Sequence, residues 1–268
     1  MSAKLAVAVM AAVIGSGCIR SATLITVKPD GSGTIEQTVL MNAAALKGML
    51  GGLGGAQQTS SGGLNEEELR KTAARLGEGV SYVSSEPLKA DDGFEGAKAL
   101  YAFTDINKIR VSQDPNLTGA APGGVSTAPK DDNPVTFALA RSGGVSNLTV
   151  TFNDKPARDK AASPAPPGGP SMDNPQMMEM MKTMFQGFKV GIDLQVVGSI
   201  IKTNADHVAG SKVTLLEMDL GALLADEAKL KEVQKVLGPN ASVAELKPYL
   251  KDIKGLKVND PVVTIAFK

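Results

Sequence analysis

The chain has 268 residues, 43% of them hydrophobic, and its 28 Lys and Arg side chains are balanced by 28 Asp and Glu side chains. This balance argues against a broad basic surface for nucleic acid, and the hydrophobic content argues against disorder of the whole chain. A single Cys and a single His exclude the usual zinc sites, a disulfide scaffold and a Cys–His nucleophile pair.

The N-terminus has the three parts of a secretory signal peptide. Lys4 supplies a positive charge, residues 5–14 form an unbroken apolar run, and small residues follow up to Gly17. A helix of this length, at about 1.5 Å per residue, reaches only about half of a ~30 Å bilayer core, which argues against a transmembrane helix. We therefore expect a signal peptide over residues 1–17, with cleavage between Gly17 and Cys18.

Cys18 is the first residue after this expected cleavage site. With Ile14-Gly15-Ser16-Gly17 before it, Cys18 resembles the acylation site of bacterial lipoproteins, although Gly15 stands where that family usually has a Leu-like residue. The resemblance implies that Cys18 carries acyl chains such as palmitate, with residues 18–21 as a short anchor segment, and several chains together give stable membrane attachment. Ordinary secretory cleavage after Gly17 is the alternative, because Gly15 and Gly17 also form a small-x-small site.

The mature chain alternates regular elements with stretches rich in Pro and Gly. Residues 22–28 and 34–41 predict a β-hairpin around Pro29-Asp30-Gly31, because Pro presets φ and Gly accepts a positive φ. Hydrophobic periodicity and capping residues predict further helices over 43–50, 66–76, 175–188, 224–237 and 243–253. Further strands are predicted over 80–84, 98–103, 135–141, 148–153, 190–201, 212–219 and 262–267. Ser142-Gly143-Gly144 makes the strands of 135–141 and 148–153 a hairpin, and the strand of 212–219 is expected to pair with that of 190–201, whose alternation predicts one buried face.

Two long inserts interrupt this pattern, near residues 113–133 and 155–173, and their Pro-rich and Gly-rich composition predicts flexible loops. Strands that meet in hairpins, with helices between them, favour an α+β fold with an antiparallel sheet and helices packed mainly on one face. We expect one such extracytoplasmic domain over residues 22–268.

Two patches of the chain resemble bacterial lipoproteins of the mycobacterial LppM-like type. The first runs from Cys18-Ile19-Arg20 to the turn Pro29-Asp30-Gly31-Ser32-Gly33, and the second comprises Gly187-Phe188-Lys189-Val190, Thr203-Asn204-Ala205 and Ser211-Lys212-Val213-Thr214. These motifs describe a turn and a hairpin and do not indicate a reaction. The resemblance implies an envelope lipoprotein of a mostly uncharacterised family, whose best-known member is associated with lipid recognition.

The segment before residue 189 is rich in Met. On a helix one face would carry the side chains of Met177, Met181, Met184 and Phe188, with Met178 and Phe185 beside it. A core helix packed on the sheet is the favoured interpretation. A soft surface for a lipid tail or a partner protein, or thioether coordination of copper(I), are the alternatives.

The remaining candidate motifs favour surface turns over chemistry. His207 lies in the turn between two predicted strands, with no nucleophile near it in sequence. Asp91-Asp92-Gly93 and Asp131-Asp132-Asn133 lack the spacing of a calcium-binding EF-hand loop. We therefore predict no catalytic residue, no metal site and no cofactor.

These observations together predict an exported, lipid-anchored protein of the cell envelope with a non-enzymatic binding or structural role. It would sit on the cell membrane or outer membrane, with its domain in the periplasm or outside the cell. Its partners would be the membrane, through the anchor, and a lipid or an envelope protein, with no nucleic acid. The alternative is a hydrophobic-ligand carrier that uses the Met-rich helix.

Overall fold

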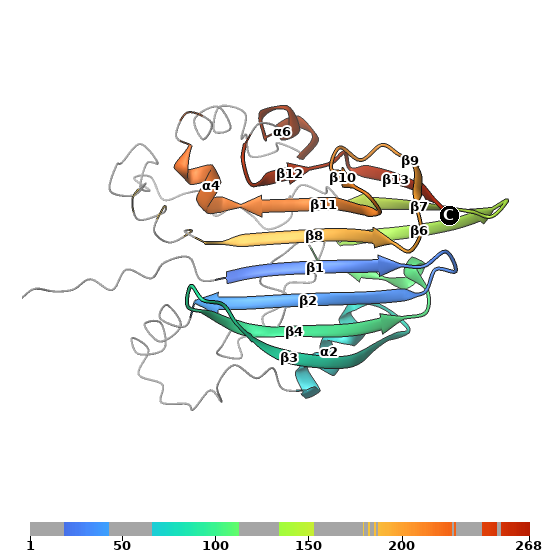
Figure 1. Ribbon diagram of the computed structural model, residues 1–268, viewed down its shortest axis with the longest axis horizontal. Helices are drawn as coiled ribbons and strands as arrows, with labels where there is room; N and C mark the ends of the chain where they lie inside the picture. The colour runs from blue at the N-terminus through green and yellow to red at the C-terminus, as the bar shows by residue number, and fades with distance from the viewer. Residues whose placement is uncertain are drawn as a thin grey trace, which may run out of the picture.

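In the computed structural model, the described residues form two β-sheets with three α-helices and one short 3₁₀ helix (Figure 1). These residues are 19–42, 66–112, 134–152, 179, 182, 185, 187–226, 228, 243–250 and 253–268. The predicted signal peptide, Cys18, both predicted inserts and the helix expected over 43–50 lie outside them.

The larger sheet has the strand order β10-β11-β8-β1-β2-β4-β3, and β12 pairs with β11. The predicted first hairpin is confirmed, because β1 pairs antiparallel with β2 around a turn in which Gly31 has a φ of +88°. The predicted antiparallel pairing of the strand after residue 189 with that of residues 212–219 is also confirmed. The strands are β1 (Ile19–Val27), β2 (Gly33–Asn42), β3 (Val80–Lys89), β4 (Phe94–Phe103), β8 (Lys189–Val196), β10 (Val208–Ala209), β11 (Lys212–Asp219) and β12 (Leu256–Val258).

The smaller sheet has the order β5-β6-β7-β13-β9, and all of its pairs are antiparallel. Its hairpin of β6 and β7 was predicted and is confirmed. Residues 190–201, predicted as one strand, instead divide between the sheets, because β8 ends at Val196 in the larger sheet and β9 begins at Ile200 in the smaller one. The strands are β5 (Arg110–Val111), β6 (Val135–Ser142), β7 (Val145–Phe152), β9 (Ile200–Thr203) and β13 (Val262–Phe267).

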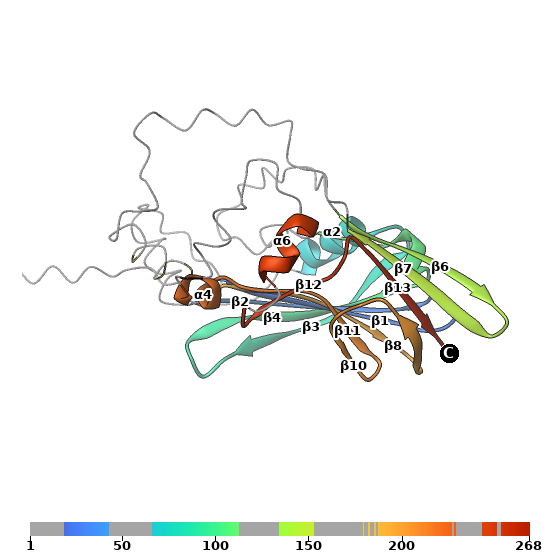
Figure 2. The same cartoon turned by 90° about the horizontal axis from the view of Figure 1, so that it is seen from above.

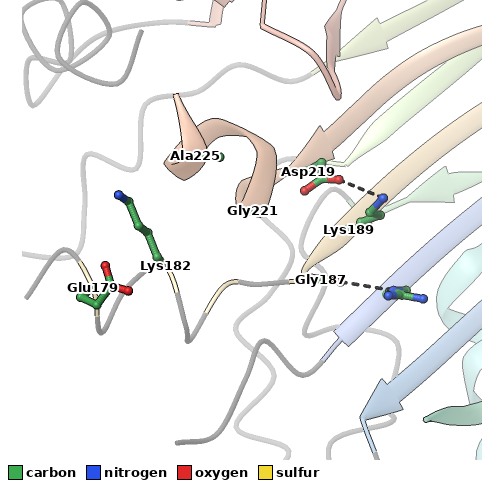
Figure 3. Close-up of a pocket in the computed structure, with 8 residues that line it drawn as sticks. Glu179, Lys182, Gly187, Lys189, Asp219, Gly221 and Ala225 are labelled. Atoms are coloured by element: carbon green, nitrogen blue, oxygen red, sulfur yellow. Dashed lines mark hydrogen bonds and ion pairs between the residues drawn. The ribbon is translucent and has the colours of Figure 1, made fainter. Parts of the chain in front are cut away.

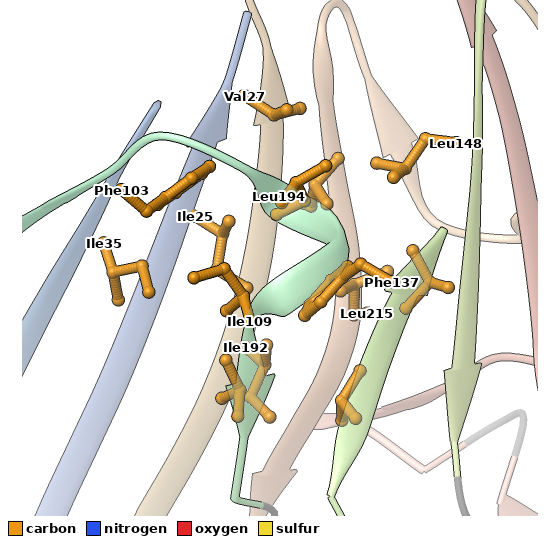
Figure 4. Packing of buried hydrophobic residues seen from close by; sticks show 14 of the residues in the cluster. Ile25, Val27, Ile35, Phe103, Ile109, Phe137, Leu148, Ile192, Leu194 and Leu215 are labelled. Atoms are coloured by element: carbon orange, nitrogen blue, oxygen red, sulfur yellow. The ribbon is translucent and has the colours of Figure 1, made fainter. Parts of the chain in front are cut away.

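One cluster of buried side chains joins the two sheets (Figure 4). Alternate residues of a strand point to the same face, and the alternation of β8 buries Ile192 and Leu194 while Asp193 stays half-buried on the other face. The smaller sheet contributes Phe137, Leu148 and other buried side chains to the same cluster. The core therefore lies between the two sheets.

The predicted α+β architecture is wrong, because the fold is mainly β. The helices of the described residues are α2 (Glu66–Leu76), α4 (Leu220–Ala225), α6 (Val243–Leu250) and the 3₁₀ helix η1 (Ile106–Lys108). Of these, α2 has the predicted bounds, and its Leu69, Ala73 and Leu76 join the core. The second sheet covers much of the apolar face that helices were expected to cover (Figure 2). The larger sheet is also mixed and not purely antiparallel as predicted, because β1 pairs parallel with β8.

Candidate functional site

The end of the larger sheet at which β1 and β8 begin brings three charged side chains together. In the parallel pair Arg20 is the partner of Lys189, and in the antiparallel pair of β8 and β11 Lys189 is the partner of Asp219. Directly paired residues point to the same face of a sheet, so these three side chains are neighbours on the face opposite the core.

Asp219 connects this end of the larger sheet to α4. Its Oδ2 lies 2.9 Å from the Nζ of Lys189, and its Oδ1 accepts a hydrogen bond of 2.9 Å from the backbone N–H of Ala222. The second contact is a helix N-cap, which satisfies one of the amide donors that a helix leaves unpaired at its start. The Asp219 side chain is only 16% exposed, whereas that of Lys189 is 57% exposed.

Arg20 is held from three sides. Its Nη1 lies 2.7 Å from Oδ2 of Asp92, its Cζ lies 3.7 Å from the centre of the Phe94 ring, and its Nε donates to the carbonyl oxygen of Gly187 at 3.4 Å. The hydrogen bond from Arg20 is the main cause of a pKa of Asp92 below its ordinary value. The guanidinium therefore has a fixed position at the end of the larger sheet where β1 begins.

These residues line a pocket of about 530 Å³ (Figure 3). Lys189 and Asp219 stand on one side of it, and Glu179 and Lys182 stand on the other. Gly187 forms part of the wall, where a larger residue would be crowded, because a Cβ there would lie 3.2 Å from the Phe94 ring. The full lining is Arg20, Glu179, Lys182, Gly187, Lys189, Asp219, Gly221 and Ala225. Its volume is within the range of about 300–1,000 Å³ of small-molecule sites, but its wall is far more charged than is usual for them.

Most of the residues predicted for function lie outside the described part of the chain. This holds for Gly17 and Cys18 and for the four methionines Met177, Met178, Met181 and Met184. Phe185 and Phe188 are described and half-buried, with their rings in an edge-to-face contact of 6.0 Å between centroids. The carbonyl of Phe188 accepts a hydrogen bond from the N–H of Leu220, which ties this segment to α4 beside the pocket.

Neither Lys189 nor Asp219 was predicted as a site residue, and Arg20 and Lys189 were named only as part of the resemblance to LppM-like lipoproteins. Asp219 had a detectable signal, since Asp before an apolar helical run is a typical N-cap. The Asp91-Asp92-Gly93 turn was correctly predicted at the surface, where it joins β3 to β4 and positions Asp92 for Arg20. His207 lies between β9 and β10, as expected of a turn residue.

Two further properties concern metals and membranes. Within the described residues, no group of three or more His, Cys, Asp or Glu side chains is arranged to hold a metal ion. No helix in that part of the chain is long and apolar enough to span a bilayer.

Comparison with known proteins gives one distant neighbour. No protein-family model and no curated protein matches the sequence. Among solved structures, the NMR structure of the folded domain of LppM from Mycobacterium tuberculosis is similar over 77% of this chain and 85% of that chain. The sequence identity is 14% and the TM-score is 0.35. This structural neighbour is of the LppM type that two patches of the sequence resemble.

Proposed function

We propose that this chain is an exported, lipid-anchored protein of the bacterial cell envelope, with a non-enzymatic binding role at the membrane surface. The observation that carries the proposal is the position of Arg20. Strand β1 begins at Ile19, the residue after Cys18, and Arg20 is already part of the pocket wall. No linker separates the predicted anchor from the site.

The distances support a membrane-facing pocket. Two residues of extended chain span at most about 7 Å, so acyl chains on Cys18 would hold Arg20 within that distance of the anchor. The headgroup region of each leaflet is roughly 5–8 Å thick, since a bilayer of about 40–45 Å contains a hydrocarbon core of about 30 Å. An acylated Cys18 would therefore place the pocket end of the larger sheet at the headgroup layer.

The chemistry of the wall favours a polar ligand. A carrier for an acyl chain needs an apolar cavity, whereas this pocket is lined by five ionisable side chains. We assign no catalytic role to Asp219, because its two carboxylate oxygens already cap α4 and pair with Lys189. A binding role needs only that these groups hold a ligand in place.

The anchor is tested by changing Cys18→Ala in the full chain expressed in a bacterial host. Palmitate labelling and membrane fractionation should show a labelled, membrane-bound wild type and an unlabelled variant in the soluble fraction. Gly15 and Gly17 leave an ordinary cleavage site in the variant, so export should continue. A variant that is exported and cleaved yet stays in the membrane fraction would refute acyl anchoring, and Ser16→Ala is the control for a neutral change beside the site.

A further inference from the structure

We propose that the pocket at the start of β1 and β8 binds a ligand that carries both a phosphate and a primary ammonium group, as in a phosphoethanolamine headgroup. This inference takes the location of the pocket at the membrane surface from the proposed function. Its chemistry follows separately from the charges of the wall.

The charges of the wall are mixed and nearly balanced. Three cations, Arg20, Lys182 and Lys189, line the same pocket as two carboxylates, Glu179 and Asp219. Asp92, just outside the lining, pairs with Arg20. A ligand with only a negative charge would meet the cations but also the carboxylates, and a ligand with only a positive charge would meet the opposite mismatch. A ligand with both charges can place its phosphate against the cations and its ammonium against the carboxylates of the same wall.

The ion pair of Lys189 and Asp219 can be replaced by contacts of each side chain to a ligand. An exposed ion pair contributes little to stability, because solvent screens it and both side chains lose freedom on forming it. The Lys189 ammonium is mostly exposed and can turn to a phosphate. The Asp219 carboxylate is fixed by its hydrogen bond from Ala222, so its second oxygen remains in place to accept from a ligand ammonium.

Arg20 gives the site a rigid cation. The Phe94 ring, the Asp92 carboxylate and the Gly187 carbonyl hold its guanidinium before any ligand arrives. A guanidinium has five N–H donors in a planar fork, so these contacts leave further donors for a phosphate. A group that is already in position loses little conformational entropy on binding, which favours affinity.

The test uses soluble headgroups and the full chain purified in detergent, so it does not depend on acylation. Calorimetric titration at low salt compares glycerophosphoethanolamine with glycerol 3-phosphate and with ethanolamine. We expect glycerophosphoethanolamine to bind at least ten-fold more tightly than either single-charge compound. Absence of saturable binding, or equal binding of glycerol 3-phosphate, would overturn the proposal.

A pair of variants separates recognition from folding. Asp219→Asn keeps a residue that caps α4 well but removes the carboxylate. It should weaken glycerophosphoethanolamine by about ten-fold and strengthen glycerol 3-phosphate, two opposite changes that loss of structure cannot produce. Lys189→Gln should weaken both phosphate compounds, while Lys202→Gln, on exposed β9, should change neither. A parallel loss of both ligands in Asp219→Asn would contradict the assigned role of its carboxylate.

Vesicles then identify the source of the ligand. The exported Cys18→Ala chain is sedimented with vesicles of phosphatidylcholine alone, or mixed with phosphatidylethanolamine or phosphatidylglycerol. Selective retention on phosphatidylethanolamine supports the site and assigns it to a membrane headgroup. Soluble headgroup binding without such retention supports the same site and assigns it to a free compound. If the palmitate-labelled wild type bound no headgroup compound, this inference would be refuted, while the proposed lipid-anchored function would be unaffected.

Discussion

Arg20 stacks on Phe94, with the guanidinium carbon 3.7 Å from the centre of the ring. Phe94 is almost fully buried although it lies on the face of the larger sheet that points away from the core. Arg20 thus covers one face of this aromatic ring, and it does so two residues after Cys18. The start of β1 is therefore fastened to the β3–β4 turn as well as to its neighbouring strands.

Arg20→Ala should lower the free energy of unfolding by about 0.5–1 kcal/mol, the usual contribution of a cation–π contact at an exposed site. It should also change the acid response. Because Arg20 lowers the pKa of Asp92 below 3.8, the stability from this pair is present above pH 3.8 and is lost as the pH falls through the lowered pKa. Urea unfolding of both proteins should therefore differ most near neutral pH and less in acid. A difference that stays constant down to pH 2 would contradict the role of Asp92, and Lys202→Ala controls for the loss of a surface cation.

Gly187 and Gly191 form a matched pair for testing the pocket wall. Gly187 has a φ of +85°, and a Cβ there would lie 3.2 Å from the Phe94 ring, so Gly187→Ala should destabilise the fold by more than about 1 kcal/mol. Gly191 lies within β8, where a Cβ would meet nothing closer than the Leu216 carbonyl oxygen at 4.0 Å. Gly191→Ala should be neutral or stabilising by up to about 1 kcal/mol. Denaturant midpoints measure the stability of both variants. Equal losses of stability would show that the positive φ and the nearby Phe94 ring do not constrain Gly187.

Local elements were predictable because their signals are local. The Pro29-Asp30-Gly31 turn fixed the first hairpin, and the acids and Arg75 of residues 66–76 fixed the bounds of α2. The alternation of apolar residues from Val190 to Val196 showed that one face of the strand is buried but not what buries it. That face could pack on a helix or on another sheet, and the sequence analysis assigned it to the wrong one.

Long-range pairing carried no signal in the single sequence. Arg20 and Lys189 are adjacent only because β1 and β8 pair in parallel, across most of the length of the chain. The pocket depends on that pairing together with the end of β11, so its residues could not be grouped from their spacing. The predictions for Gly17, Cys18 and the methionines remain untested, because these residues lie outside the described part of the chain.

Ile192 and Ile201 test whether the space between the sheets is the main core. Ile192 is 2% exposed in β8, and Ile201 is 52% exposed in β9. Ile192→Ala should lower the free energy of unfolding by about 2–5 kcal/mol, because apolar burial is lost and a cavity remains. Ile201→Ala should change stability by less than about 0.5 kcal/mol. Chemical unfolding followed by circular dichroism measures both, and similar costs for the two changes would argue against the observed packing.

Asn259 satisfies the backbone where β11 departs from regular pairing. The register of β11 against β8 shifts between Thr214 and Leu216. The Nδ2 of Asn259 donates to the carbonyl oxygens of Thr214 and Leu215 at 2.8 and 2.9 Å, and its Oδ1 accepts from the N–H of Asp206 at 2.9 Å. The residue is 3% exposed, so water does not replace these bonds when they are lost.

Asn259→Ala should therefore cost about 1–3 kcal/mol for the backbone groups that lose a partner. Asn259→Asp should cost more at neutral pH, because it places a carboxylate against two carbonyl oxygens. Burial and those oxygens raise the pKa of the introduced carboxyl, so this extra cost grows as the pH rises and disappears in acid, where the protonated group can donate to one of the two carbonyls. Unfolding of the two variants between pH 4 and pH 8 measures the difference. Asn204→Asp, at an exposed amide that donates to the Val262 carbonyl, should show a much smaller pH dependence. Equal stabilities of Asn259→Ala and Asn259→Asp across this range would show that the amide is not the donor that holds the two β11 carbonyls.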